Sequence, residues 1–299
     1  VNIGDFGKTT GESFFDLVKA LDAVEVLYRM TANEHMHPLD VKEGKIEVIA
    51  DTEGLLKVDR EKLKKVNAFG EMMIATRHGN TVVKKGDKLA GTRIIPLVIK
   101  KDKMQEAEKI CDGTPILKIL PFTVKKAAII TTGNEVYHGR IKDAFTPVIE
   151  QKIAEFGAEM MFHEIFDDND RKITDGCLRA IEAGADIVFC TGGMSVDPDD
   201  KTPLAIKNTG AEMISYGSPV LPGAMFLLSY YRKGDKVIPI CGLPGCAMYN
   251  RRTIFDLVLP RLMAADPVTA DELASLGEGG LCLNCKVCTF PNCGFGKGW

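Results

Sequence analysis

The sequence predicts an α/β protein whose second domain, residues 126–265, is a three-layer domain built on a mostly parallel sheet. Two apolar runs, Ala127–Thr131 and Asp186–Cys190, carry little or no polar alternation, which is typical of strands buried on both faces. Helical patterns separate these runs, and alternating strands and helices build a parallel sheet. A smaller β-rich domain at residues 1–125 comes before it, and a four-cysteine tail at residues 266–299 follows.

Strand patterns dominate the first domain from Lys45 to about Lys101. Lys45–Ala50 alternates between polar and apolar residues, Asp51–Gly54 supplies a turn, and Leu55–Val58 follows, which predicts a hairpin. The density of such patterns predicts a small barrel or sandwich.

Four further segments of this domain carry secondary-structure signals. Met72–Thr76 and Lys88–Ile99 flank turn residues, which predicts a second strand pair. Arg60–Val66 is expected to form a short helix, and an apolar pattern of helical period runs from Phe14 to Val24.

The remaining elements of the second domain follow in chain order. The predicted elements are a helix at Phe145–Phe156, a strand at Glu159–His163, helices at Arg171–Ala183 and near Leu204–Lys207, a strand at Met213–Tyr216, a hairpin of Met225–Tyr231 and Val237–Cys241, and a closing helix at Tyr249–Met263. Asp143, Asp170 and Asp200 precede three of these helices and are candidates for their N-caps.

Composition excludes two classes of partner. The 38 Lys and Arg residues against 41 Asp and Glu residues give a net charge of −3, and no long basic stretch exists to bind nucleic acid. The longest apolar runs, such as Ile94–Ile99, are far shorter than the roughly 18 residues of a membrane span, and the N-terminus carries no signal-peptide pattern. We therefore expect a cytoplasmic protein.

Three glycine-bearing loops follow predicted strands, at Thr131–Val136, Thr191–Asp200 and Gly242–Cys246. Ligands of open α/β sheets bind beyond the carboxyl ends of the strands, where glycines let backbone amides approach phosphate. A tight turn explains any one loop, but three at equivalent ends favour a ligand. No GxGxxG or GxxxxGK[ST] motif is present here, so the predicted phosphate site is of another type.

Carboxylates gather around the same loops. They are Glu135, Asp143, Asp167, Asp168, Asp170, Asp197, Asp199 and Asp200. Helix capping accounts for about three of them. Carboxylates that face a phosphate need a cation between the two anions, so the others predict bound Mg²⁺.

Five motifs in this order resemble the molybdopterin-binding fold of molybdopterin adenylyltransferases and molybdopterin molybdenumtransferases, over about Ala127–Ala265. They are Gly133–Val136 with Gly139–Asp143, the Asp167-Asp168 pair, Gly192–Val196 with Asp200 and Thr202, the Pro222-Gly223 core of Leu221–Met225, and Gly242–Ala247. Three departures stand out: Asp197 replaces a glycine, Cys246-Ala247 replaces Asn-Pro, and Leu221–Met225 lacks two lysines of the family pattern.

The resemblance implies a small-molecule pterin ligand, molybdopterin or its adenylylated form, with Mg²⁺ and either ATP or molybdate as second substrate. Glu135 and Asp200 would position the cation, and Asp168 or Asp167 would contact the reacting group. The implied cofactor-binding residues are Thr132, Gly133, Asp143, Thr191, Gly192, Gly193, Ser195, Pro222, Gly223, Gly242, Leu243, Pro244 and Gly245.

Two other functions stay open. The missing lysines favour a non-enzymatic carrier that hands the cofactor to a molybdoenzyme client, and the same fold occurs in nucleotide pyrophosphate hydrolases. Family members commonly associate, so a homo-oligomer is expected.

The tail holds four cysteines within twelve residues, Cys282, Cys285, Cys288 and Cys293. This spacing favours tetrahedral Zn²⁺ over an iron–sulfur cluster, whose last cysteine usually follows after three residues and precedes proline. An unmetallated flexible tail is the third possibility. A separate unit that contributes little to folding is expected here, whereas the five scattered cysteines are expected to be small buried side chains.

Overall fold

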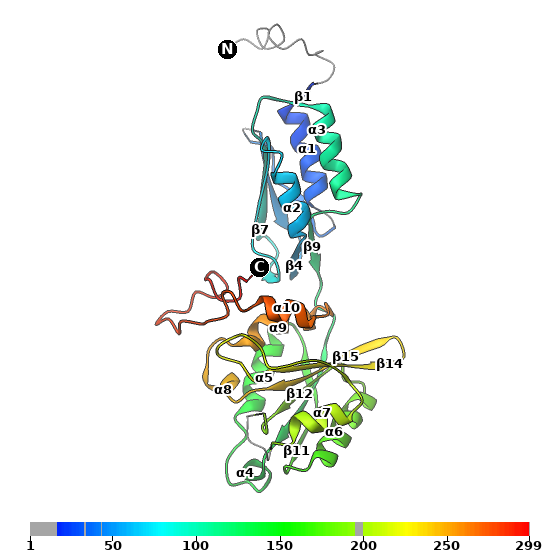
Figure 1. The fold of residues 1–299 in the computed structure, drawn as a ribbon, viewed down its shortest axis with the longest axis vertical. Helices are drawn as coiled ribbons and strands as arrows, with labels where there is room; N and C mark the ends of the chain where they lie inside the picture. The colour runs from blue at the N-terminus through cyan, green and yellow to red at the C-terminus, as the bar shows by residue number, and fades with distance from the viewer. Residues whose placement is uncertain (1–16, 33, 43, 195–199, 299) are drawn as a thin grey trace. The chain divides into compact units, whose positions relative to one another are not determined.

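The computed structural model describes residues 17–32, 34–42, 44–194 and 200–298. The chain divides into two compact units between Pro121 and Phe122, which are coloured blue to cyan and green to red in Figure 1. Among the described residues, no helix is both long and apolar enough to span a lipid bilayer.

The first unit is rich in strands, as the sequence predicts. Its largest sheet is antiparallel and has the order β2 (Met36–Pro38), β3 (Lys45–Ala50), β7 (Lys88–Ile94), β5 (Met72–Thr76). Two smaller sheets are β6 (Thr81–Val83), β4 (Gly54–Val58), β9 (Leu117–Leu120), and β1 (Leu17–Lys19), β8 (Val98–Lys100). The predicted pairing of Met72–Thr76 with Lys88–Ile99 is confirmed in β5 and β7.

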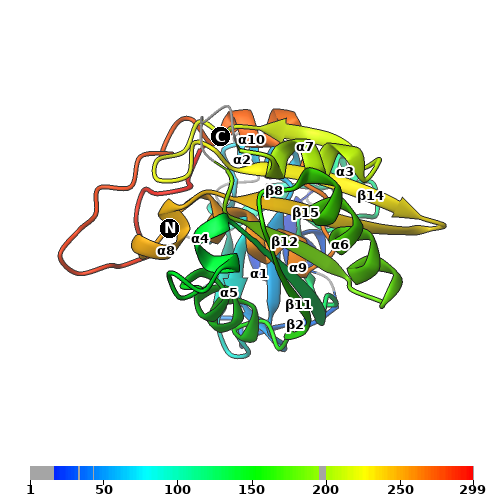
Figure 2. The ribbon, with the colours of Figure 1, turned by 90° about the horizontal axis from the view of Figure 1, so that it is seen from below.

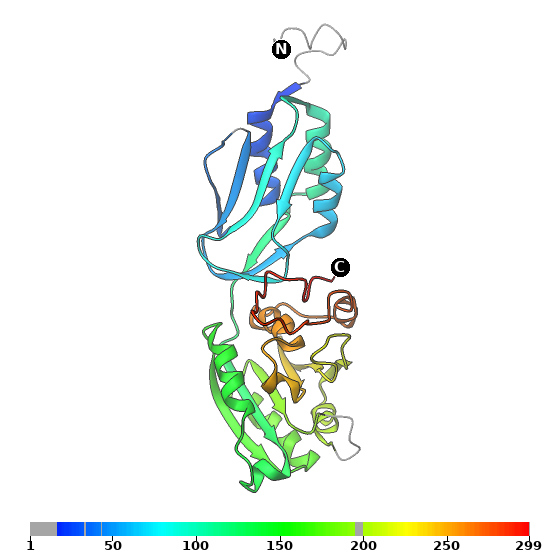
Figure 3. The ribbon, with the colours of Figure 1, turned by 90° about the vertical axis from the view of Figure 1, so that its left-hand side faces the viewer.

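Helices add a further layer to the described part of this unit, and one of them confirms the helix predicted at Arg60–Val66 (Figure 3). They are α1 (Ala20–Thr31), α2 (Arg60–Asn67) and α3 (Lys101–Cys111). Helix α1 packs on β3 and β7 through Val24 and Leu27, which are fully buried. The helices therefore supply one side of the core of this unit.

The predicted hairpin of Lys45–Ala50 with Leu55–Val58 is wrong. Strand β3 pairs with β2 and β7, whereas β4 pairs with β6 and β9. Gly54 permits the close approach of β4 to β9, because a Cβ there would lie 2.5 Å from the Leu120 carbonyl oxygen of β9. The chain turns between the two strands but passes into another sheet.

The second unit contains a six-stranded sheet of the predicted mostly parallel kind. Its order is β11 (Glu159–Phe166), β10 (Lys126–Thr132), β12 (Ile187–Thr191), β15 (Lys236–Leu243), β14 (Leu227–Lys233), β13 (Glu212–Tyr216). The first four strands are parallel, and β14 is antiparallel to both of its neighbours.

Helices cover both faces of this sheet, so the three-layer prediction is confirmed (Figures 1 and 2). Helices α6 (Asp170–Glu182) and α7 (Thr202–Asn208) pack against side chains such as Ile130 and Val188. Helices α5 (Phe145–Ala154) and α9 (Ile254–Met263) cover the opposite face, where the rings of Phe189 and Phe255 lie 5.3 Å apart. Burial on both faces explains the apolar runs of β10 and β12.

The predicted closing helix is interrupted. The segment forms α8 (Cys246–Tyr249), an extended Asn250 and then α9. Thr253 and Asp256 form a capping box. The Thr253 side chain accepts a backbone amide of the first turn, and the Asp256 side chain accepts the Thr253 amide. A new helix therefore begins at Ile254.

The N-cap positions of α5, α6 and α7 are held by Ala144, Asn169 and Lys201, and so not by the three predicted aspartates. Asn169, not Asp170, accepts the Lys172 amide at the start of α6, at 3.1 Å. Lys201, and not Asp200, occupies the N-cap position of α7. Asp143 accepts the amides of Phe145 and Thr146 at the start of α5.

The tail packs on the second unit instead of standing apart from it. It begins with α10 (Ala270–Ser275), where Leu273 is buried, and Phe295 near its end is also buried. The hydroxyl of Tyr230 in β14 accepts the Val268 amide at 2.7 Å. Between Leu276 and Gly298 the chain forms no helix or ladder strand.

Candidate functional site

The strand order of the sheet changes direction at β10. The chain leaves β10 toward β11 on one side, whereas β12 pairs with the other side of β10. Thr131 and Thr191 stand side by side in register near the two carboxyl ends. A crevice between loops that diverge in this way is the usual ligand site of an open α/β sheet.

Two threonine hydroxyls join the two loops and the first residue of α7. Thr132 donates to the Thr191 carbonyl oxygen at 3.1 Å, and Thr202 donates to the Gly192 carbonyl oxygen at 2.9 Å. The two hydroxyl oxygens lie 3.0 Å apart, and all these groups are buried or half-buried. The backbone after β12 is thus fixed before any ligand binds.

Glycine is required at both positions of the Gly192-Gly193 pair. Gly192 has φ +80°, and a Cβ there would lie 2.1 Å from the Thr132 carbonyl oxygen. At Gly193, with φ +52°, a Cβ would lie 2.8 Å from the Thr202 hydroxyl. Gly133 has φ +131° but open space around it. The first two glycines permit a close backbone approach, and the third leaves room at the end of β10.

A buried network of four side chains lies beneath this edge. One oxygen of Asp143 accepts from Thr131 at 2.9 Å and from Thr146 at 2.6 Å, and His163 Nε2 lies 3.2 Å from both hydroxyls. Burial by itself would raise the pKa of Asp143, but hydrogen bonds from Thr146, Thr131 and Phe145 together lower it. The bonds of Asp143 therefore run inward to the fold.

Replacing Asp143 by asparagine is expected to lower the free energy of unfolding by about 1–3 kcal/mol at pH 7. The folded pKa lies below the unfolded one, so this contribution exists above about pH 4 and fades as pH falls through the folded value. Urea unfolding between pH 3 and 7 measures the difference, with the exposed Asp175→Asn as control. A difference that does not change with pH would contradict the prediction.

The predicted catalytic carboxylates lie at the same edge. Asp168 accepts the Asn134 amide at 3.2 Å and so joins the loops after β11 and β10. Glu135 is exposed on the short α4 (Asn134–Tyr137). Asp200 is half-buried, and together with burial its charge raises the pKa of Tyr216 in β13. No three His, Cys, Asp or Glu side chains gather closely enough to hold a metal ion within the described ranges.

Two buried polar atoms near these loops have no hydrogen-bond partner among the described residues. They are Thr191 Oγ1 and Asp167 Oδ1. The other oxygen of Asp167 accepts from Lys172 at 2.8 Å. An unpaired buried polar atom costs about 1–3 kcal/mol and is rare in native structures, and the described residues hold a third, Thr92 Oγ1 in β7.

The third glycine segment lies at the same edge of the sheet, where Leu243 is in register with Thr191 of β12. Gly242 and Leu243 are the last residues of β15, and a Cβ at Gly242 would lie 2.5 Å from Met194 Cε. Pro244 follows the strand, and Gly245 opens α8 with free space around it. Gly242 therefore makes room for Met194, and Gly245 is the open position.

Pro222 and Gly223 pack on α9 and the tail. The Pro222 carbonyl oxygen accepts the Ile254 amide at 3.1 Å, and a Cβ at Gly223 would lie 2.3 Å from Ile254 Cγ2. No described contact joins them to Gly192 or Gly133. Ser195, together with Asp197 and Asp199, lies outside the described residues.

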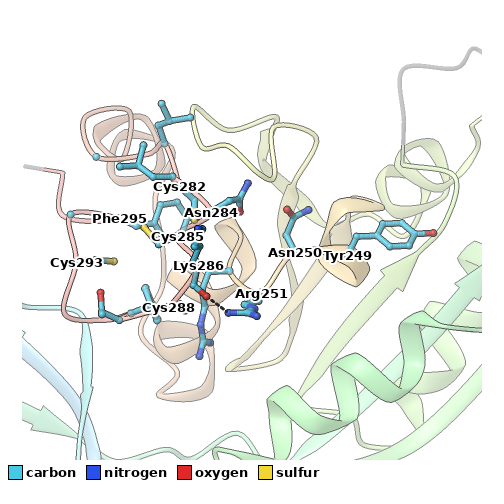
Figure 4. Close-up of a pocket in the computed structure, with 17 residues that line it drawn as sticks. Tyr249, Asn250, Arg251, Cys282, Asn284, Cys285, Lys286, Cys288, Cys293 and Phe295 are labelled. Atoms are coloured by element: carbon cyan, nitrogen blue, oxygen red, sulfur yellow. Dashed lines mark hydrogen bonds between the residues drawn. The ribbon is translucent and has the colours of Figure 1, made fainter.

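The four tail cysteines line one cavity of about 600 Å³ (Figure 4). Tyr249, Asn250, Arg251 and Arg252, which come just after the Gly245 segment, form part of its wall. All nine cysteines are free, and four of the five scattered ones are buried, as expected.

Residues 128–264 match the family profile described as "Probable molybdopterin binding domain". The second unit contains a domain of the molybdopterin-binding family. The first unit and the tail lie outside the matched range.

Proteins similar to this family domain carry other names. The chain is 30% identical over 129 residues to a "Putative competence-damage inducible protein" of Bacillus cereus, covering 43% of this chain and 30% of that protein. A protein of the same name from Bacillus subtilis is 32% identical over 85 residues, covering 28% and 20%. The chain thus spans less than a third of the length of these curated relatives.

Two solved structures also resemble it. One is the tungsten cofactor synthesizing protein MoaB from Pyrococcus furiosus, with 18% identity and a TM-score of 0.40 over 48% of this chain and 98% of that one. Another is the protein CinA with unknown function from Thermoplasma acidophilum, with 17% identity and a TM-score of 0.37 over 46% and 98%.

Proposed function

We propose that the second unit binds molybdopterin or its adenylylated form in the crevice between the carboxyl ends of β10 and β12. The observation that carries the proposal is the Gly192-Gly193 backbone, held by Thr132 and Thr202 where no Cβ fits. A backbone fixed in advance can offer its amides to a phosphate without losing conformational freedom on binding. The unpaired Thr191 hydroxyl adds a buried group with free hydrogen-bonding capacity beside it.

The residues at these strand ends would contact different parts of the ligand. Gly192, Gly193 and Thr191 would hold the phosphate end of the ligand, and the open position at Gly133 would admit its bulk. The pterin supplies a dithiolene that holds the metal. Asp168 would orient the reacting group while keeping the Asn134 amide in place.

Mg²⁺ would lie between Glu135, Asp200 and the ligand phosphate. Mg²⁺ commonly uses one or two carboxylates and completes its octahedron with phosphate oxygens and water, so a protein cluster of three is not needed. Glu135→Gln and Asp200→Asn are expected to weaken ligand binding about tenfold in the presence of Mg²⁺ and not at all in EDTA. Anaerobic calorimetric titration measures both, and equal losses in the two buffers would contradict the cation's role.

We infer that the bound pterin undergoes adenylylation or accepts molybdate, in the cytoplasm and in a homo-oligomer. The rival function is a carrier that delivers the cofactor to a molybdoenzyme. It is favoured by the Pro222-Gly223 loop, which lacks the two lysines and packs on Ile254. Repeated turnover per chain would support transfer chemistry, and tight binding without turnover would support the carrier.

Thr202→Val tests the crevice directly. It removes the hydroxyl that holds Gly192 and contacts Thr132, so molybdopterin binding is expected to weaken about tenfold, from the loss of about one hydrogen bond. Thr209→Val is the matched control. Thr209 is also buried at an end of α7, and its hydroxyl donates to the Ile206 carbonyl oxygen at 2.6 Å. Equal binding by wild type and Thr202→Val, both shown to be folded, would overturn the site.

A further inference from the structure

We propose that the four tail thiols form a tetrathiolate metal centre, with Arg251, Arg252 and Lys286 as its cationic shell, on the second unit and outside the pterin crevice. The ligand is a soft, thiolate-seeking metal, either Zn²⁺ or an iron–sulfur cluster. None of the residues proposed to hold the pterin lines this cavity.

The first argument is convergence. Cys282, Cys285, Cys288 and Cys293 lie on a segment without helix or ladder strand, yet all four line the same cavity (Figure 4). Their spacing of two, two and four intervening residues suits closure around one centre. Nothing in the pterin-binding proposal uses them.

Charge supplies the second argument. Of the described residues that line the cavity, none carries a carboxylate, and three carry a permanent positive charge. Four thiolates around Zn²⁺ have a net charge of −2, as does a common form of a four-iron cluster with its ligands. Arg252 lies on the cavity wall while also donating to Asp256 at 2.9 Å, and Arg251 donates to the Lys286 carbonyl oxygen at 3.4 Å. Cations on the wall of the cavity would balance the negative charge of such a centre.

The third argument is that both ends of the segment are anchored. The Cys282 amide donates to the Leu221 carbonyl oxygen at 2.8 Å. At the other end Phe295 is buried, and the Gly296 amide donates to the Gly279 carbonyl oxygen at 3.0 Å. A Cβ at Gly296 would lie 2.3 Å from Leu257 Cδ2, so this end packs tightly on α9.

The anchored ends hold two of the four thiols, and the other two must move to complete the metal site. Cys282 and Cys293 are half-buried next to the anchors, whereas Cys285 and Cys288 are exposed on the stretch between them. No three of the thiols lie at coordination distance in the structure as described. Metal binding must therefore draw residues 283–294 inward, with release of the thiol protons to solvent. Assembly of a cluster would also require ferrous iron and sulfide.

The test uses the full chain, purified anaerobically without added metal and then stripped and titrated with Co²⁺. We expect about one zinc per chain, or iron with acid-labile sulfide and a brown colour; either identifies the centre. Co²⁺ should give intense thiolate-to-cobalt charge-transfer absorption at one equivalent. Protection of residues 283–294 from proteolysis should rise with the metal.

The double variant Cys285→Ser, Cys288→Ser is expected to lose the charge-transfer signal and at least about 100-fold in Co²⁺ affinity. Both residues are exposed, so the fold should survive their change. Cys246→Ser, a half-buried cysteine outside the tail, is the matched control and should bind as wild type does. The proposal would be overturned if the purified chain held no stoichiometric metal and bound no Co²⁺. It would also be overturned if the double variant gave the same charge-transfer absorption as the wild type.

Discussion

Asp256→Ala is expected to lower the free energy of unfolding of the second unit by about 3–5 kcal/mol. The Asp256 side chain is 4% exposed, and one of its oxygens accepts from Lys152 and, at 2.9 Å, from Arg252. The other oxygen accepts the Thr253 amide at 2.8 Å at the start of α9. Alanine would leave the Lys152 ammonium, itself 13% exposed, buried without its partner.

Urea unfolding at pH 7 measures this loss. Asp271→Ala is the matched control, since Asp271 is an exposed carboxylate in the first turn of α10 and its loss should cost less than about 1 kcal/mol. A loss below about 1 kcal/mol at Asp256 as well would show that this buried ion pair does not stabilise the start of α9.

Gly192→Ala is expected to abolish molybdopterin binding, with a loss of at least about 100-fold, and to destabilise the unit by about 2–5 kcal/mol. The new Cβ would lie 2.1 Å from a backbone oxygen of Thr132, which no side-chain rotation can relieve. The loops after β10 and β12 would have to separate, and the threonine bonds between them would break.

Gly184→Ala separates steric conflict from backbone strain. Gly184 also has a positive φ, +99°, but a Cβ there meets nothing within 4 Å. It should lose only about 1–2 kcal/mol of stability and keep full ligand affinity. Calorimetric titration and urea unfolding of both variants decide the matter, and unimpaired binding by Gly192→Ala would exclude the crevice as the pterin site.

The sequence predicts the second unit better than the first because its strands are buried on both faces. An apolar run such as Ala127–Thr131 has one interpretation there, and the loops that follow such strands share one edge of the sheet. In the first unit, Lys45–Ala50 and Leu55–Val58 show the local pattern of a hairpin, but their partners are set by residues far away, such as Leu120. Turn residues predict that the chain changes direction, but they do not predict which strand the next segment pairs with.

The candidate site divides in the same way. The glycine motifs point to Gly192 and Gly193, but only the strand order places them against Thr132. His163 was missed because a single histidine in a strand gives no periodic signal, although it faces two buried hydroxyls. The break before Ile254 did have a local signal, since Thr253 with Asp256 three residues later is a capping pair.

The contacts of Arg261 set the true extent of this folding unit. Arg261 is 6% exposed, and its guanidinium is bound by Asp266, the Pro267 carbonyl oxygen and Glu272. All three lie beyond residue 264, where the family match ends. A fragment that ends at residue 264 would leave the buried Arg261 guanidinium without its carboxylate partners. The segment that directly follows the matched range therefore supplies the counter-charges of a buried side chain of α9 and belongs to the same folded unit.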